Sequence, residues 1–143
     1  MTDTTVLLVD DEADFVAALA ERLEVRGLRV DTAANGAIAL DKARARVYDA
    51  VLLDMAMPGL NGLETLRGLL AVNPDQQVIL LTGRATLQQG VEAMKLGALD
   101  LLEKPADIAM LVTRIEDAAK RRTALDDRRV DERVRGILHK KGW

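Results

Sequence analysis

The sequence predicts an α/β fold in which helices cover both faces of a five-stranded parallel sheet. Two observations lead to this class. Five short runs rich in leucine and β-branched residues alternate with five segments whose apolar residues recur at helical spacing, as in strands joined by helices. The first, third and fourth runs are almost continuously apolar, which is typical of strands buried on both faces.

The strands and helices follow one another in a regular order. Strands are expected at 5–9 (TVLLV), 28–33 (LRVDTA), 49–54 (DAVLLD), 77–82 (QVILLT) and 99–102 (LDLL). The helices are marked by Phe15, Leu19 and Leu23, by Ile38, Leu40 and Ala43, by Leu63, Leu66 and Leu70, by Val91 and Met94, and by Ile108, Leu111, Val112 and Ile115. We expect the second helix to begin near Asn35, and Gly27 and Gly97 to end the first and fourth.

Composition limits the possible classes of protein. The 143 residues are 49% apolar and 30% charged and include no cysteine, so a disulfide framework and a thiolate metal site are excluded. No apolar run approaches the roughly 18 residues of a membrane span, and the first residues do not resemble a signal peptide. We therefore expect one domain without a membrane segment, located in the cytoplasm.

Charge is unevenly distributed along the chain. The segment 119–143 contains 9 Lys and Arg against 4 Asp and Glu, whereas the whole chain has a net charge of −3. Neither Gly nor Pro interrupts residues 106–135, so the fifth helix is expected to continue into this region. We divide the chain into a domain at 1–121 and a basic C-terminal tail at 122–143, a helical extension or linker whose charge most simply forms a solvated helix face.

Polar side chains occur at the carboxyl ends of the expected strands. Asp10 and Asp11 follow the first strand, Asp54 and Thr82 end the third and fourth, and Lys104 follows the fifth. In an open parallel sheet these ends border the crevice where ligands bind. Three converging carboxylates suit a hard cation such as Mg²⁺. A carboxylate beside Mg²⁺, a lysine and a hydroxyl is a plausible phosphoryl acceptor.

Each of these features has a simpler interpretation when taken alone. The acids Asp10 to Glu12 could have no role beyond stabilising the N-terminus of a helix. Asp54 could simply begin a turn. Thr82 could cap the next helix, and Lys104 could be a solvated surface residue. Their joint occurrence, each at its own strand end, favours a common site.

At these residues the sequence resembles the receiver domain of two-component response regulators. The similarity covers nearly all of residues 4–121 and consists of "LLVDDE", "DAVLLDMAMPGLNGLE", "VILLTGRA" and "GALDLLEKP" in the family's order and spacing. It implies a doubly wound, flavodoxin-like sheet of strand order 2-1-3-4-5. The segment 82–105 is similar to receivers of sigma-54-type activators.

The resemblance implies a role for each strand-end residue. Asp54 corresponds to the phosphoacceptor, and Asp10 and Asp11 to the acidic pair that holds Mg²⁺. Asp11, Asp54 and the backbone carbonyl of Ala56 are the expected direct ligands. Thr82 corresponds to the hydroxyl that moves toward the phosphoryl group.

Four further positions complete or depart from the family's pattern. Lys104 corresponds to the lysine that pairs with the phosphoryl group, and Pro105 to a cis-proline. Leu101 stands where the family usually has Tyr or Phe, so the way in which the signal leaves the site is open. Arg84 could cover the site or contact the phosphate, or point into solvent.

The resemblance implies a phosphorylation-dependent switch that modifies only itself and is not an enzyme for other substrates. The expected donor is a histidine kinase or phosphotransfer protein, and the output target is unknown. The chain is expected to be either a stand-alone receiver or a fragment of a larger regulator. Its tail could serve as a dimer-forming helix, a linker helix or a partner-binding arm. Direct DNA binding is not expected. The alternative, a haloacid-dehalogenase-like phosphatase, is disfavoured because Ala56 stands where those enzymes place a second aspartate. His139 is expected to be exposed and not to act as a phosphodonor.

Overall fold

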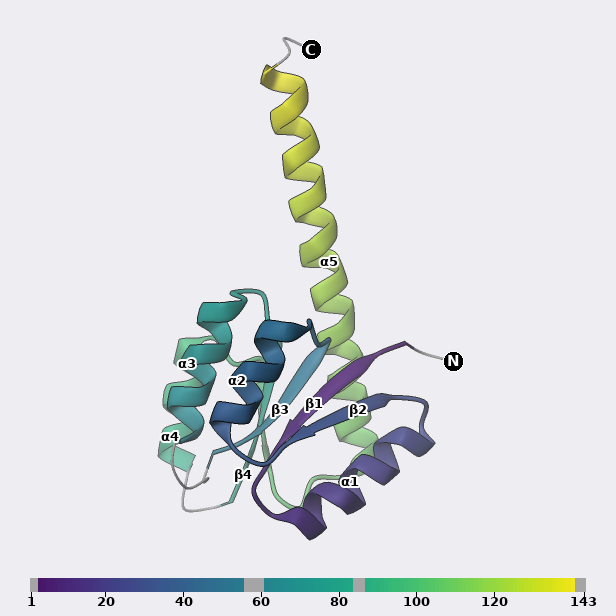
Figure 1. The fold of residues 1–143 in the computed structure, drawn as a ribbon, viewed down its shortest axis with the longest axis vertical. Helices are drawn as coiled ribbons and strands as arrows, with labels where there is room; N and C mark the ends of the chain where they lie inside the picture. Colours follow the sequence, from purple (N-terminus) through teal and green to yellow (C-terminus); the bar gives the residue numbers. More distant parts are fainter. Residues whose placement is uncertain (1–2, 56–60, 84–86, 141–143) are drawn as a thin grey trace.

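The computed structural model describes residues 3–55, 61–83 and 87–140 and has the α/β architecture expected from the sequence (Figure 1). Its five strands form one parallel sheet of order β2-β1-β3-β4-β5. The strands are β1 (Thr5–Val9), β2 (Arg29–Ala33), β3 (Ala50–Asp54), β4 (Val78–Thr82) and β5 (Asp100–Glu103). The expected strand order is therefore confirmed.

Helices cover both faces of this sheet. They are α1 (Ala13–Val25), α2 (Gly36–Ala45), α3 (Gly62–Val72), α4 (Leu87–Leu96) and α5 (Ile108–Lys140). Helices α1 and α5 pack on one face, and α2, α3 and α4 on the other (Figure 1). The Asn35 side chain accepts a hydrogen bond from the Ile38 N–H at 2.9 Å and begins α2, whereas Gly27 and Gly97 follow α1 and α4 with φ of 90° and 117°, as expected.

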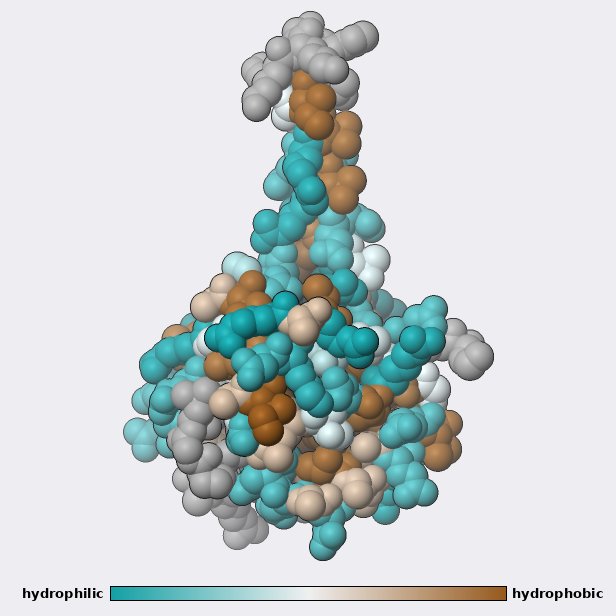
Figure 2. Space-filling view, viewed as in Figure 1, coloured by the Kyte–Doolittle hydropathy of each residue, from teal (hydrophilic) through white to brown (hydrophobic). Residues whose placement is uncertain are grey.

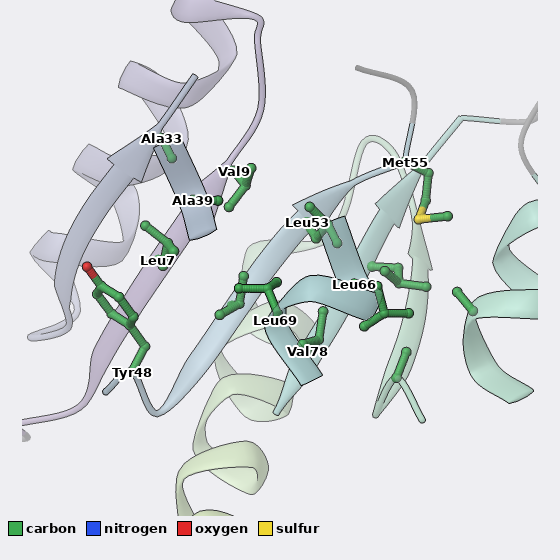
Figure 3. Packing of buried hydrophobic residues seen from close by; sticks show 14 residues of the cluster. Leu7, Val9, Ala33, Ala39, Tyr48, Leu53, Met55, Leu66, Leu69 and Val78 are labelled. Carbon is green, nitrogen blue, oxygen red and sulfur yellow. The ribbon is translucent and has the colours of Figure 1, made fainter. Parts of the chain in front are cut away.

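Two apolar clusters, one on each face, form the core. On the first face Leu53, Leu66, Leu69 and Val78 pack between the sheet and α3 (Figure 3). On the other face the cluster is formed by alternate residues of the same strands together with α1 and α5: Val6, Leu8, Leu23, Leu52, Ile79, Leu111 and Ile115. Burial on both faces explains why β1, β3 and β4 are almost continuously apolar.

The fourth helix packs through its smallest residues. Gly90 and Ala93 are buried against the sheet, whereas Val91 and Met94, the markers used to find this helix, are 49% and 39% exposed. A Cβ atom on Gly90 would lie 2.7 Å from Cδ2 of Leu101 in β5. The absence of a side chain at Gly90 thus lets α4 approach Leu101 closely.

The last helix extends well past the sheet. Helix α5 is 33 residues long, and its C-terminal part projects away from the other elements (Figure 1). Two ion pairs hold its middle to loops at the amino edge of the sheet. Arg122 lies 2.8 Å from Asp49, and Arg129 makes two side-chain hydrogen bonds to Asp75. None of the helices in the described part of the chain is long and apolar enough to span a membrane.

Candidate functional site

Three carboxylates converge where the strand order reverses. Asp10 follows β1 and Asp54 ends β3, and these strands are neighbours although β2 lies between them in the sequence. The carboxylate oxygens of Asp10, Asp11 and Asp54 lie within 4.8 Å of one another. Asp10 and Asp54 are buried and Asp11 is exposed. The three acids therefore meet at the carboxyl edge of the sheet, as expected from the sequence.

Lys104 reaches into this acidic cluster. Its Nζ lies 2.7 Å from Oδ2 of Asp10, 3.6 Å from Oδ1 of Asp54 and 3.8 Å from Oε1 of Glu12. Burial disfavours the charge on Lys104, but the hydrogen bond to Asp10 and the negative charges of Asp54, Asp10 and Glu12 outweigh it, so the pKa of Lys104 is raised. Lys104 therefore supplies a fixed positive charge beside Asp54.

Thr82 completes the group at the carboxyl end of β4. It is buried, and its hydroxyl donates a hydrogen bond to the Gly83 carbonyl at 2.9 Å. The Thr82 carbonyl in turn accepts a hydrogen bond from the Lys104 N–H at 2.9 Å. The Lys104–Pro105 peptide bond is cis. Backbone pairing thus places the hydroxyl of β4 and the lysine that follows β5 at the same edge.

The start of α3 lies very close to the segment that follows Asp54. A Cβ atom on Gly62 would lie 2.6 Å from the Met55 Cα and 2.8 Å from its sulfur. A backbone atom cannot move aside as a side chain can, so this approach requires glycine. The Asn61 side chain caps α3 by accepting a hydrogen bond from the Glu64 N–H at 3.0 Å.

Two contacts of the site were not expected from the sequence. The Lys104 ammonium lies 4.5 Å from the centre of the Phe15 ring, and Glu12 is near enough to add to its electrostatic surroundings. Phe15 is on the face of α1 that packs against the sheet, a position that helical spacing alone assigns to the core. Of the expected site residues, Ala56 and Arg84 lie outside the described residues.

A second polar cluster lies at the β2 edge, away from the acids. The Tyr48 hydroxyl donates to Oδ2 of Asp31 at 2.7 Å, and Lys42 lies 2.8 Å from the other oxygen. Burial raises the pKa of Tyr48 to about 12, and the hydrogen bond and charge of Asp31 add to this effect. Tyr48 belongs to the core cluster of the face covered by α2, α3 and α4, and these contacts satisfy its hydroxyl group. None of the strand-end residues of the acidic site takes part in them.

The acidic cluster suits a hard cation. Its donors are carboxylate oxygens, the ligands that Mg²⁺ prefers. Among the described residues, Lys104 places one positive charge against Asp10, Asp11 and Asp54, so the group stays net negative when ionised. A divalent cation would compensate this charge, and the residues present fit such an ion.

The family of the chain follows from comparison with known proteins. The model of the response regulator receiver domain matches residues 6–116. The chain belongs to this family. It is therefore a receiver domain of two-component signalling. The transcriptional regulatory protein ZraR of Klebsiella oxytoca is 39% identical over 113 residues, which are 79% of this chain and 26% of ZraR. The transcriptional regulatory protein PrrA of Mycobacterium tuberculosis is 38% identical over 122 residues, 85% of this chain and 52% of PrrA.

Solved structures of receivers share the fold. A response regulator receiver domain protein from Clostridium thermocellum aligns with a TM-score of 0.81 and 33% identity, over 85% of this chain and 98% of that one. The receiver also aligns with NtrX from Brucella abortus, with a TM-score of 0.81 and 28% identity over 88% of this chain and 29% of NtrX. The receiver thus spans only about a quarter of ZraR and half of PrrA.

Proposed function

We propose that this receiver is a phosphorylation-dependent switch in which Asp54 accepts a phosphoryl group from a histidine kinase or phosphotransfer protein. The observation that carries the proposal is the position of Asp54, buried among Asp10, Asp11 and Lys104 at the switch point of the sheet. A carboxylate in this setting has an acidic pair for a cation beside it and an ammonium group 3.6 Å from its Oδ1 atom. We further infer that the exchange takes place in the cytoplasm, as is consistent with two-component regulators.

Each residue of the site has its own role in the transfer of the phosphoryl group. A carboxylate oxygen of Asp54 attacks the phosphorus atom of the donor's phosphohistidine. The P–N bond breaks, and its electron pair returns to the imidazole nitrogen. Lys104 and the Thr82 hydroxyl stabilise the equatorial oxygens. A bound Mg²⁺, held by Asp10, Asp11 and Asp54 with the Ala56 carbonyl, would neutralise charge on the same oxygens. Hydrolysis of the acyl phosphate by water then restores Asp54. Because both steps take place on Asp54, the receiver modifies only itself.

The readout must begin at Thr82 and Leu101. We propose that the Thr82 hydroxyl leaves the Gly83 carbonyl for the phosphoryl group and that Leu101, which pairs with Leu80 two residues before Thr82, transmits the change to α4. Phosphorylation then shifts the population between two surface states that differ in affinity for a target. Because the curated relatives are transcriptional regulatory proteins of greater length, that target is a partner or an attached output segment. A dehalogenase-like phosphatase stays disfavoured, since residue 56 is alanine.

The direct test is intact mass after incubation with acetyl phosphate and Mg²⁺. We expect one phosphoryl group on the wild type and on Asp41→Asn, a matched change of an exposed acid on α2, and none on Asp54→Asn. Equal modification of Asp54→Asn and the wild type would place the acceptor elsewhere. If the wild type stays unmodified, binding of beryllofluoride decides, because rapid hydrolysis does not remove that analogue. Failure to bind it would contradict the proposal.

A further inference from the structure

The ring of Phe15 lies against the charged end of Lys104. The ammonium nitrogen is over the face of the ring, 4.5 Å from its centre. A cation within about 6 Å of an aromatic centre is attracted by the negative face of the ring, and more strongly where water is excluded. The Lys104 side chain is 18% exposed. The contact is therefore attractive and is largely withdrawn from water.

The carboxylates around Lys104 do not fix its position by themselves. They lie at different distances from Nζ, 2.7 Å for Asp10, 3.6 Å for Asp54 and 3.8 Å for Glu12. Asp10 and Asp54 are buried, whereas the Glu12 side chain is 67% exposed and competes for the ammonium from the solvent side. A lysine side chain is long and flexible, so it can follow either set of acids. The distance from Lys104 to Asp54 therefore depends on what else holds the ammonium.

The start of α1 brings both Glu12 and Phe15 to Lys104. Glu12 precedes the helix and Phe15 follows three residues later, on the same side. Phe15 is partly buried against the core cluster of the face covered by α1 and α5. It also lines a hollow together with Pro105, the residue after Lys104. Packing thus fixes the ring, whereas the Glu12 carboxylate ends an exposed side chain.

Packing alone does not require an aromatic residue at this position. The other apolar residues of the same cluster are aliphatic, and Phe15 is the only phenylalanine of the chain. Phe15 also takes no part in the row of hydrophobic residues that Figure 2 shows along the projecting part of α5, away from the acidic cluster. The aromatic ring therefore has a further reason, and its contact with Lys104 provides one.

We propose that Phe15 is a positioning residue for phosphoryl transfer, whose ring face holds the Lys104 ammonium beside Asp54. The ring attracts the charge without offering an acceptor oxygen. The N–H donors of Lys104 therefore stay available for Asp10 and for the phosphoryl oxygens. Phe15 acts only through Lys104. This inference rests on the function proposed for Asp54 and adds to it a residue that lies on a helix, outside the strand ends.

Fluorination of the ring tests the contact with little change of shape. Because Phe15 is the only phenylalanine, growth on mono-, tri- or pentafluorophenylalanine alters this position alone. Fluorine withdraws electrons from the ring and weakens the negative face that attracts the cation. We expect the rate of phosphorylation by acetyl phosphate at saturating Mg²⁺ to fall stepwise along the series, by about three- to tenfold at its end. Phe15→Tyr keeps an aromatic face and should react as the wild type does.

Two controls separate this role from packing. In a Lys104→Met background, which lacks the ammonium, the fluorinated proteins should all react at the same, lower rate. Leu19→Ala removes apolar packing one turn further along the same face of α1. It should lower the free energy of unfolding and leave the phosphorylation rate within about twofold of the wild type.

Nuclear magnetic resonance reports the contact without Mg²⁺ or phosphate. The ring current of Phe15 should shift the Hε resonance of Lys104 upfield, and Phe15→Leu should abolish this shift. A wild type without the shift would overturn the contact.

The kinetic outcomes distinguish this inference from the function on which it rests. A phosphorylated wild type whose rate is the same with every ring would overturn the positioning role and leave the function proposed for Asp54 intact. Equal effects of fluorination with and without the Lys104 ammonium would also overturn that role. If the wild type accepts no phosphoryl group and binds no beryllofluoride, the proposed function fails, and the positioning role fails with it.

Discussion

At the residue scale, the contact between Leu101 and Gly90 decides how β5 meets α4. The family usually has an aromatic residue at this position, and here a shorter aliphatic side chain packs against a helix that has no side chain opposite it. An added Cβ on Gly90 would lie 2.7 Å and 3.0 Å from the two methyl carbons of Leu101. Leu101 is partly buried against the core cluster of that face. The fit therefore depends on both residues together.

Gly90→Ala should have opposite effects with and without the leucine side chain. Alanine stabilises a helix interior by roughly 0.5–1 kcal/mol relative to glycine, whereas overpacking costs roughly 1–3 kcal/mol. We expect the substitution to lower the free energy of unfolding by about 1 kcal/mol in the wild type. In a Leu101→Ala background it should raise that free energy by about 0.5–1 kcal/mol. Denaturant unfolding of the four proteins gives the coupling between the two residues.

Gly136 offers the matched control for this cycle. It also lies inside a helix, α5, but a Cβ there would meet nothing within 4 Å. Gly136→Ala should therefore cost no stability and should increase helix content by circular dichroism. The proposed contact would be contradicted if Gly90→Ala changed the free energy of unfolding equally in both backgrounds.

At the element scale, periodicity located the strands and helices well but not every packed face. All five strands begin and end within one residue of the expected runs, and β1, β3 and β4 are the clearest because buried strands leave continuous apolar sequence. On α4, by contrast, Val91 and Met94 suggested the packed face, yet the sheet contacts Gly90 and Ala93. Close approach favours small residues, which hydrophobicity does not reveal.

The attachment of α5 also could not be predicted from the sequence. Arg129 and Asp75 are 54 residues apart, and nothing in local spacing connects them. Arg129→Gln should loosen the distal part of α5, because it removes both hydrogen bonds to Asp75. Exposed ion pairs are weak, so we expect a several-fold increase in amide exchange after residue 126. Arg128→Gln is the control, since Arg128 forms none of the ion pairs found among the described residues; an equal increase there would exclude a specific role for Arg129.

The same ion pair makes this attachment sensitive to acid. The hydrogen bond from Arg129 holds the pKa of Asp75 below its ordinary value of 3.8, with burial opposing and the charge of Arg129 assisting. A lowered carboxyl pKa contributes stability above the unfolded value that is lost as pH falls through the folded one. Backbone chemical shifts of the distal helix should therefore stay helical at neutral pH and begin to move toward coil below about pH 4.

At the scale of the whole molecule, topology explains why the strand-end residues could be assigned from sequence. Once β1 and β3 are neighbours, Asp10 and Asp54 must meet, whatever the details of packing. The surroundings of Lys104 were not predictable in this way. Its contact with Phe15 depends on where α1 crosses the sheet, and its nearness to Glu12 depends on how that helix begins.

The convergence of acids has a consequence for the stability of the whole receiver. Repulsion among Asp10, Asp11 and Asp54 opposes folding, and a cation bound only by the folded state relieves it. At ten times its dissociation constant, Mg²⁺ should add about 1.4 kcal/mol and raise the melting temperature by about 3–6 °C. Asp11→Asn should melt higher than the wild type without Mg²⁺ and gain little from it. Glu21→Gln removes one exposed acid of α1 outside the cluster and should respond as the wild type does. A full Mg²⁺ response in Asp11→Asn would show that Asp11 holds no cation.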